Sequence, residues 1–174
     1  RASRTCTKHL TGAAEKVLLV KISPQGSLVI AMDDARKVYA FRTADGQLLG
    51  QWKAPTRASS IAIARENGPV LVGSESGRLY RLDLGRERMD EIKWNSRAAN
   101  FDPLRSLVSS SCGRYAVGTT IYGAELFNLE RKTSLGVMYR KNLTVHAIDV
   151  ADSDLRLTYS DGVNVLIGEC KLGA

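Results

Sequence analysis

The stretch VLLVKISPQGSLVIAMDDARKVYAFRTADGQLLGQW, which runs from Val17 to Trp52, decides the fold of this chain. It holds four short apolar segments, at about residues 17–23, 27–32, 36–43 and 47–52. Gly, Asp and Pro separate the segments, and these residues supply the backbone angles that tight turns need. Short apolar segments between such turns are typical of β-strands. The stretch therefore predicts a four-stranded antiparallel meander.

The same pattern recurs at residues 59–94, 106–139 and 144–170, the last copy being truncated. Two independent landmarks repeat with it. The turn glycines Gly26, Gly68 and Gly113 are 42 and 45 residues apart, and the closing aromatic residues Trp52, Trp94 and Tyr139 show the same spacings. A four-stranded repeat of this length is typical of a propeller blade, whose sheet faces are buried only against neighbouring blades.

We therefore predict an all-β fold, a β-propeller of four-stranded antiparallel blades with about 3.5–4 blades present. The predicted organisation is an N-terminal segment at 1–16 and blades at 17–52, 53–94, 95–139 and 140–174. Two arrangements stay open. Residues 4–10 supply a last strand that closes a small four-bladed ring, or the chain is about half of a larger disc. The second is favoured, because blades of this kind are shaped for larger rings and unsealed ends would expose sheet faces that need cover.

Several phrases resemble the WD40 family. Ile22-Ser23-Pro24-Gln25-Gly26 is similar to that family's turn between its first two strands, and Gly73 to Gly77 is similar to its next turn. Leu82-Asp83 and Phe127-Asn128 stand where the family has Trp-Asp. The resemblance implies a divergent WD40-like propeller, part of a larger ring. It also implies that the usual buried polar tetrad is missing or replaced, because no repeat keeps Trp-Asp or the opening Gly-His.

A second resemblance is to quinoprotein-like propellers. Val38-Tyr39-Ala40-Phe41, followed by Ala44 to Leu49, is similar to their repeats. However, Gly50 stands where their docking tryptophan would be. The quinoprotein-like reading is therefore the less favoured of the two.

The charge of the chain bears on its partners. Lys and Arg number 25 against 18 Asp and Glu, giving a net charge of +7, and residues 1–60 alone hold ten basic and four acidic side chains. Such a balance favours an acidic partner. Because the sequence has no run of basic residues and few aromatic ones, we expect an acidic protein surface or peptide, with nucleic acid as the less favoured partner.

Other classes of function find little support. The sequence has no apolar run long enough for a membrane span, so no membrane partner is expected. Three cysteines without a CxxC pair suggest neither a zinc site nor a disulfide framework, and favour a cytoplasmic or nuclear setting. With two histidines, of which His146 lies three residues before Asp149, we expect no enzyme and no cofactor. A Ser-His-Asp site using one of Ser109 to Ser111 is disfavoured, because serines before a turn are routine in this repeat.

The blade pattern predicts where binding residues lie. In a four-stranded meander, the loop leading into the first strand and the turn between the second and third strands fall on one face of the disc. Rigidly held loops of this kind commonly carry binding. The predicted partner-binding residues are Lys53, Arg57, Arg97, Phe101, Arg105, Arg140 and Lys141, with Asp34, Glu75, Tyr122 and Asp161 interspersed.

The sequence thus favours a non-enzymatic protein–protein interaction scaffold within a larger multiprotein assembly. The alternative is an RNA-associated propeller subunit of a ribonucleoprotein or ribosome-assembly particle, for which the positive charge argues. A quinoprotein-like propeller domain is the second alternative. The remaining blades would come from a further segment of the chain or from another copy.

Overall fold

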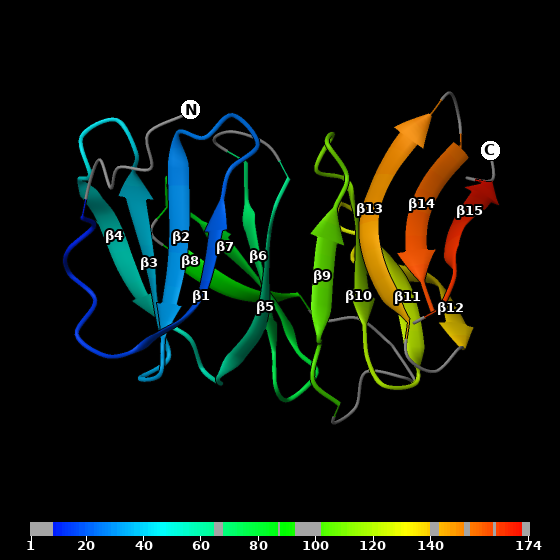
Figure 1. The fold of residues 1–174 in the computed structure, drawn as a ribbon, viewed down its shortest axis with the longest axis horizontal. Helices are drawn as coiled ribbons and strands as arrows, with labels where there is room; N and C mark the ends of the chain where they lie inside the picture. Colours follow the sequence, from blue (N-terminus) through cyan, green and yellow to red (C-terminus); the bar gives the residue numbers. More distant parts are fainter. Residues whose placement is uncertain are drawn as a thin grey trace.

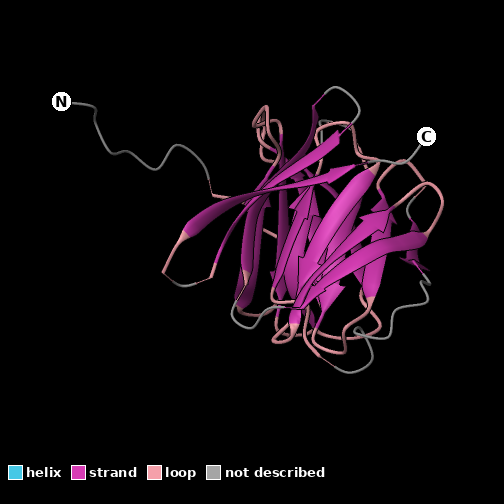
Figure 2. Cartoon of the chain, turned by 90° about the vertical axis from the view of Figure 1, so that its right-hand side faces the viewer, coloured by secondary structure: helices cyan, strands magenta, loops and turns pink. Residues whose placement is uncertain are grey.

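The computed structural model describes residues 9–64, 68–86, 88–92, 102–139, 143–151, 154–161 and 163–171. Within these residues the chain forms strands and no helix, and so no helix long and apolar enough to cross a membrane (Figure 2). The strands form four separate antiparallel sheets in which each strand pairs with its successor in the chain. We call these sheets blades 1 to 4, and they confirm the predicted propeller-type meanders.

The strands have the following bounds. Blade 1 consists of β1 (Val17–Ile22), β2 (Leu28–Asp33), β3 (Lys37–Arg42) and β4 (Leu48–Lys53), and blade 2 of β5 (Ala58–Ile63), β6 (Val70–Ser74), β7 (Leu79–Asp83) and β8 (Arg88–Ile92). Blade 3 consists of β9 (Ser106–Ser109), β10 (Tyr115–Thr119), β11 (Gly123–Asn128) and β12 (Thr133–Tyr139). Blade 4 has three strands, β13 (Thr144–Ala151), β14 (Asp154–Ser160) and β15 (Val165–Lys171).

The first strand of each blade lies on the inside of the arrangement. β1, β5, β9 and β13 follow one another across the molecule, and each contacts the next (Figure 1). The remaining strands of each blade extend away from this row, so that the blades stand beside one another with their sheet faces in contact. The result is a fan of four blades around a row of inner strands.

The turn between the first and second strands is built in the same way in blades 1 and 3. The Ser23 hydroxyl accepts the backbone N–H of Leu28 (3.0 Å), and the Ser110 hydroxyl accepts that of Tyr115 (3.1 Å). Gly26 and Gly113 follow three residues after each serine, with φ of 79° and 73°. This left-handed conformation favours glycine. The recurring Ser and Gly of the sequence are therefore one turn structure, used twice.

Apolar side chains fill the spaces between adjacent blades. Ile30 and Val38 of blade 1 pack with Ile61 and Val72 of blade 2, and Trp52 packs against this cluster. Trp52, the closing aromatic residue of the first repeat, therefore serves interblade packing; Trp94 lies outside the described residues. Similar clusters join blade 2 to blade 3 and blade 3 to blade 4.

Leu104, just before β9, fastens blade 3 to blade 2. Its side chain is 1% exposed, and its carbonyl oxygen accepts the hydroxyls of Ser59 (2.8 Å) and Ser60 (2.6 Å). Its backbone N–H donates to the carbonyl oxygen of Ser74 (3.1 Å). One residue thus contributes both apolar packing and hydrogen bonds to this junction.

Residues 9–16 run across the face of blade 1 that points away from blade 2. Leu10 and Ala13 pack against Ala31, Tyr39 and Phe41 on that face. Residues 9–16, which we call the strap, contain no strand, and residues 1–8 lie outside the described part. A ring-closing strand at residues 4–10 therefore stays a prediction.

Candidate protein-binding face

In blades 1 to 3, the loop that leads into the blade lies beside the turn between its second and third strands, as the blade pattern predicts. The N–H of Asp34 donates to the carbonyl oxygen of Lys16, and the N–H of Glu75 donates to that of Arg57, both at 2.9 Å. In blade 3, the N–H of Arg105 donates to the carbonyl oxygen of Thr119 (2.8 Å). These backbone bonds hold the two kinds of loop together on one edge of the fan. We call this edge the basic face.

Arg57 occupies the middle of an ion-pair cluster that joins blades 1 and 2. Its Nη2 lies 2.8 Å from Asp34 Oδ1, and its Nε lies 3.6 Å from Glu75 Oε1. The sequence places all three residues on one face, but it does not show that they pair. The charge of Arg57 is therefore balanced by two carboxylates.

Lys53 and Arg105 have exposed side chains on the same face. Arg36, in the neighbouring turn, donates from Nη1 to the carbonyl oxygen of Pro55 (3.2 Å), and Tyr122 is 51% exposed in the corresponding turn of blade 3. Asp161 lies partly exposed after β14. The predicted residues Arg97, Phe101, Arg140 and Lys141 lie outside the described residues. The described part of the face thus presents the exposed side chains of Lys53, Arg105 and Tyr122 in addition to the Arg57 cluster.

Asp33 is a buried carboxylate beneath this face, which sequence reasoning did not identify. Its Oδ2 accepts the Tyr39 hydroxyl (2.6 Å) and its Oδ1 accepts the N–H of Lys37 (2.8 Å). Burial first, and then the hydrogen bond to Asp33, raise the pKa of Tyr39 above its ordinary value. Of the adjacent residues Asp33 and Asp34, one carboxylate is therefore internal and the other pairs with Arg57.

Blade 2 has Ser74 at the position of Asp33. The Ser74 hydroxyl accepts the N–H of Arg78 (3.0 Å), as Asp33 accepts that of Lys37 four residues later. It also lies 3.0 Å from the Ser76 hydroxyl. Both blades thus have a side-chain hydrogen-bond acceptor at the end of the second strand, but the residue is Asp33 in blade 1 and Ser74 in blade 2. Only the recurring position before each turn could have indicated it.

Two of the side chains considered for catalysis, those of His146 and Ser110, make local hydrogen bonds. His146 is exposed and its Nε2 lies 2.8 Å from the Ser160 hydroxyl. The Ser110 hydroxyl is buried in its turn, where it bonds to the backbone of Tyr115. Among the residues described, no group of three His, Cys, Asp or Glu side chains could hold a metal ion.

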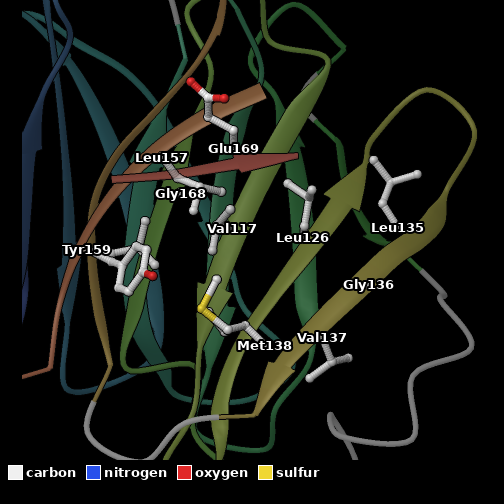
Figure 3. Close-up of a pocket in the computed structure, with 12 residues that line it drawn as sticks. Val117, Leu126, Leu135, Gly136, Val137, Met138, Leu157, Tyr159, Gly168 and Glu169 are labelled. Atoms are coloured by element: carbon white, nitrogen blue, oxygen red, sulfur yellow. The ribbon is translucent and has the colours of Figure 1, made fainter. Parts of the chain in front are cut away.

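Two of the hollows between the described strands bear on the arrangement of the blades. The first, of about 320 Å³, is lined by the inner strands of all four blades, with Lys21, Arg105 and His146 among its lining residues. The second, of about 200 Å³, lies between blades 3 and 4 (Figure 3). Its apolar lining includes Leu126, Leu135, Met138 and Leu157. Sequence reasoning predicted neither, because each depends on how successive blades are angled.

No family model and no curated protein matches this sequence. Among solved structures, a structure of U3-55K is similar to it, with a TM-score of 0.67 and 12% sequence identity. The similarity covers 91% of this chain and 53% of the U3-55K chain, so this chain spans about half the length of the structure it matches. At this identity the likeness concerns the fold. The antiparallel meanders and this likeness together show a β-propeller fold for the chain.

Proposed function

We propose that this chain is a non-enzymatic interaction module of a multiprotein assembly, and that its basic face binds an acidic protein surface or peptide. The observation that carries the proposal is the ion-pair cluster of Arg57 with Asp34 and Glu75, flanked by the exposed cations Lys53 and Arg105. Backbone hydrogen bonds fix the loops that bear these side chains. A face built in this way can bind without first ordering its loops.

The ion pairs of Arg57 are weak enough for a carboxylate of the partner to replace Asp34 or Glu75. The side chains of Arg57, Asp34 and Glu75 are 44%, 53% and 50% exposed, and exposed ion pairs of this kind contribute only about 0–1 kcal/mol. A carboxylate of the partner can therefore replace Asp34 or Glu75 at little cost. Lys53 and Arg105 add the long-range attraction that brings an acidic partner to the face.

Removing the exposed cations tests the proposal. The double variant Lys53→Ala/Arg105→Ala should bind an oligoglutamate peptide about tenfold more weakly than the unchanged chain, measured by fluorescence anisotropy at low salt. The control is Arg131→Ala, which removes an exposed cation from the turn between β11 and β12. Equal affinity of the double variant and the unchanged chain would show that this face does not bind acidic peptides.

RNA is a second candidate partner, favoured by the net charge of +7. The same variants can be titrated with an oligouridine. Phosphate contacts release counterions, so RNA binding would weaken steeply as salt rises. Tight, strongly salt-dependent oligouridine binding together with weak oligoglutamate binding would favour the RNA-associated function over the peptide-binding one.

A further inference from the structure

The end face of blade 4, which points away from blade 3, exposes apolar side chains. Val165 and Ile167 on β15 are 78% and 74% exposed. They pair across the strands with Ser160 and Thr158, and directly paired residues share one face of a sheet. On the opposite face, Leu157 is buried against blade 3. Blade 4 therefore ends the described fan with an uncovered sheet face.

The end face of blade 1, which points away from blade 2, is also apolar. Val20 and Ile22 on β1 are 58% and 60% exposed, and they pair with Ala31 and Val29 of β2. The strap covers the outer half of this face, over Tyr39 and Phe41, and leaves the inner half open. Both ends of the fan thus present exposed apolar side chains, and the end face of blade 4 also bears the ion pair of Arg156 with Glu169 (3.2 Å).

The contacts between adjacent blades show what kind of surface an apolar blade face packs against. Between blades 1 and 2, β-branched and aliphatic side chains from the two sheets pack directly, as Val38 and Val72 do within one cluster. A blade 4 placed against a blade 1 would repeat this type of contact. The inner strands of the four blades line one shared hollow, and the chain matches about half of a solved propeller. Two such fans have the extent of one ring.

We propose that two copies of this chain close a ring, with blade 4 of each copy against blade 1 of the other. A twofold axis along the centre of the ring makes the two junctions identical, so this head-to-tail contact closes. In this ring, each copy covers both end faces of the other copy. Val165 and Ile167 become buried against the blade 1 surface formed by Val20, Ile22 and the strap.

Sedimentation velocity over a range of concentrations tests the proposal. The unchanged chain should shift from 19.0 kDa to twice that mass as its concentration rises. Val20→Glu and Ile167→Glu should each raise the dissociation constant of the dimer by roughly 100-fold, because each places a carboxylate in a dry junction. Arg131→Glu, which changes an exposed residue in the turn between β11 and β12, away from both ends, should leave the constant unchanged.

Mixing the two variants distinguishes this ring from other dimers. A mixed pair of Val20→Glu and Ile167→Glu chains has one junction free of substitutions, so mixing should restore association that neither variant shows alone. If the circular dichroism of a glutamate variant differs from that of the unchanged chain, the corresponding serine variant, Val20→Ser or Ile167→Ser, is used in its place.

Three outcomes would overturn the proposal. One is a mass of 19.0 kDa at all concentrations, which would leave the end faces to further blades or to a different protein. Another is a dimer that Val20→Glu does not weaken, which would place blade 4 against blade 4. The third is a series of species larger than a dimer, which would mean that the contact does not close.

Discussion

Tyr39 carries a proton whose loss should limit the stability of the chain in alkali. Its pKa lies above the ordinary value of 10.0 because the hydroxyl is buried and bonded to Asp33. Stability supplied by the neutral hydroxyl is therefore complete below about pH 10 and is lost as the pH rises through the raised pKa. Tyr39→Phe should lower the free energy of unfolding at pH 8 by about 1–3 kcal/mol, because Asp33 loses a donor.

Urea unfolding at pH 8 and near pH 11 measures this effect. The unchanged chain should lose more stability between the two values than Tyr39→Phe does. Tyr122→Phe is the matched control, because the side chain of Tyr122 is 51% exposed. If Tyr39→Phe loses as much stability as the unchanged chain between pH 8 and pH 11, ionisation of Tyr39 beside Asp33 does not limit the stability at high pH.

Arg36 and Gly77 occupy the same turn position in blades 1 and 2, with φ of 69° and 74°. The left-handed conformation costs a residue with a side chain about 1–2 kcal/mol, whereas glycine adopts it freely but is more flexible when unfolded. Gly77→Ala should therefore lower the free energy of unfolding by about 1 kcal/mol. Arg36→Gly should leave it unchanged or raise it, as measured by urea denaturation. A larger loss from Arg36→Gly than from Gly77→Ala would contradict this assignment.

At the scale of elements, Leu104 and Gly118 are fitted to each other at the junction of blades 2 and 3. A Cβ added at Gly118 would lie 2.9 Å from Leu104 Cδ2. Gly118→Ala should cost about 1–3 kcal/mol through overpacking, and Leu104→Ala about 2–5 kcal/mol through the cavity that it leaves. In the double variant the added methyl group enters the vacated space. Its total cost, measured by urea denaturation, should therefore be less than the sum.

Gly136 provides the control for this cycle, because a Cβ there would meet nothing within 4 Å. Gly136→Ala should be neutral or slightly stabilising. Additive costs of Gly118→Ala and Leu104→Ala would show that the two side chains do not share one space.

The strands could be predicted from the sequence because their signals are local. The expected segment 36–43 corresponds to β3, and the expected segment 47–52 corresponds to β4, since apolar runs and turn residues set both. The pairing of Arg57 with Asp34 and Glu75 depends on two blades meeting, and no local pattern encodes it. Burial of Asp33 depends on a tyrosine six residues away. The face could thus be located from the sequence, while its internal contacts could not.

At the scale of the whole molecule, stability comes from contacts between neighbouring blades. Each apolar cluster joins either two adjacent blades or blade 1 and its strap, and we find no cluster that spans the whole fan among the described residues. Repeat architectures of this kind gain stability with each junction added. The proposed ring follows the same rule, because it converts two uncovered end faces into two further junctions.

The position of the strap also bears on how the chain acquires its fold during synthesis. Residues 9–16 precede blade 1 and cover the outer half of its end face, so part of that face is protected once the four strands of the blade have left the ribosome. The face of blade 1 toward blade 2 is covered next, because blade 2 is the following segment to emerge. Each later junction between the described blades also joins neighbours in sequence. The described blades can therefore form in chain order, one at a time, through contacts between neighbours in sequence.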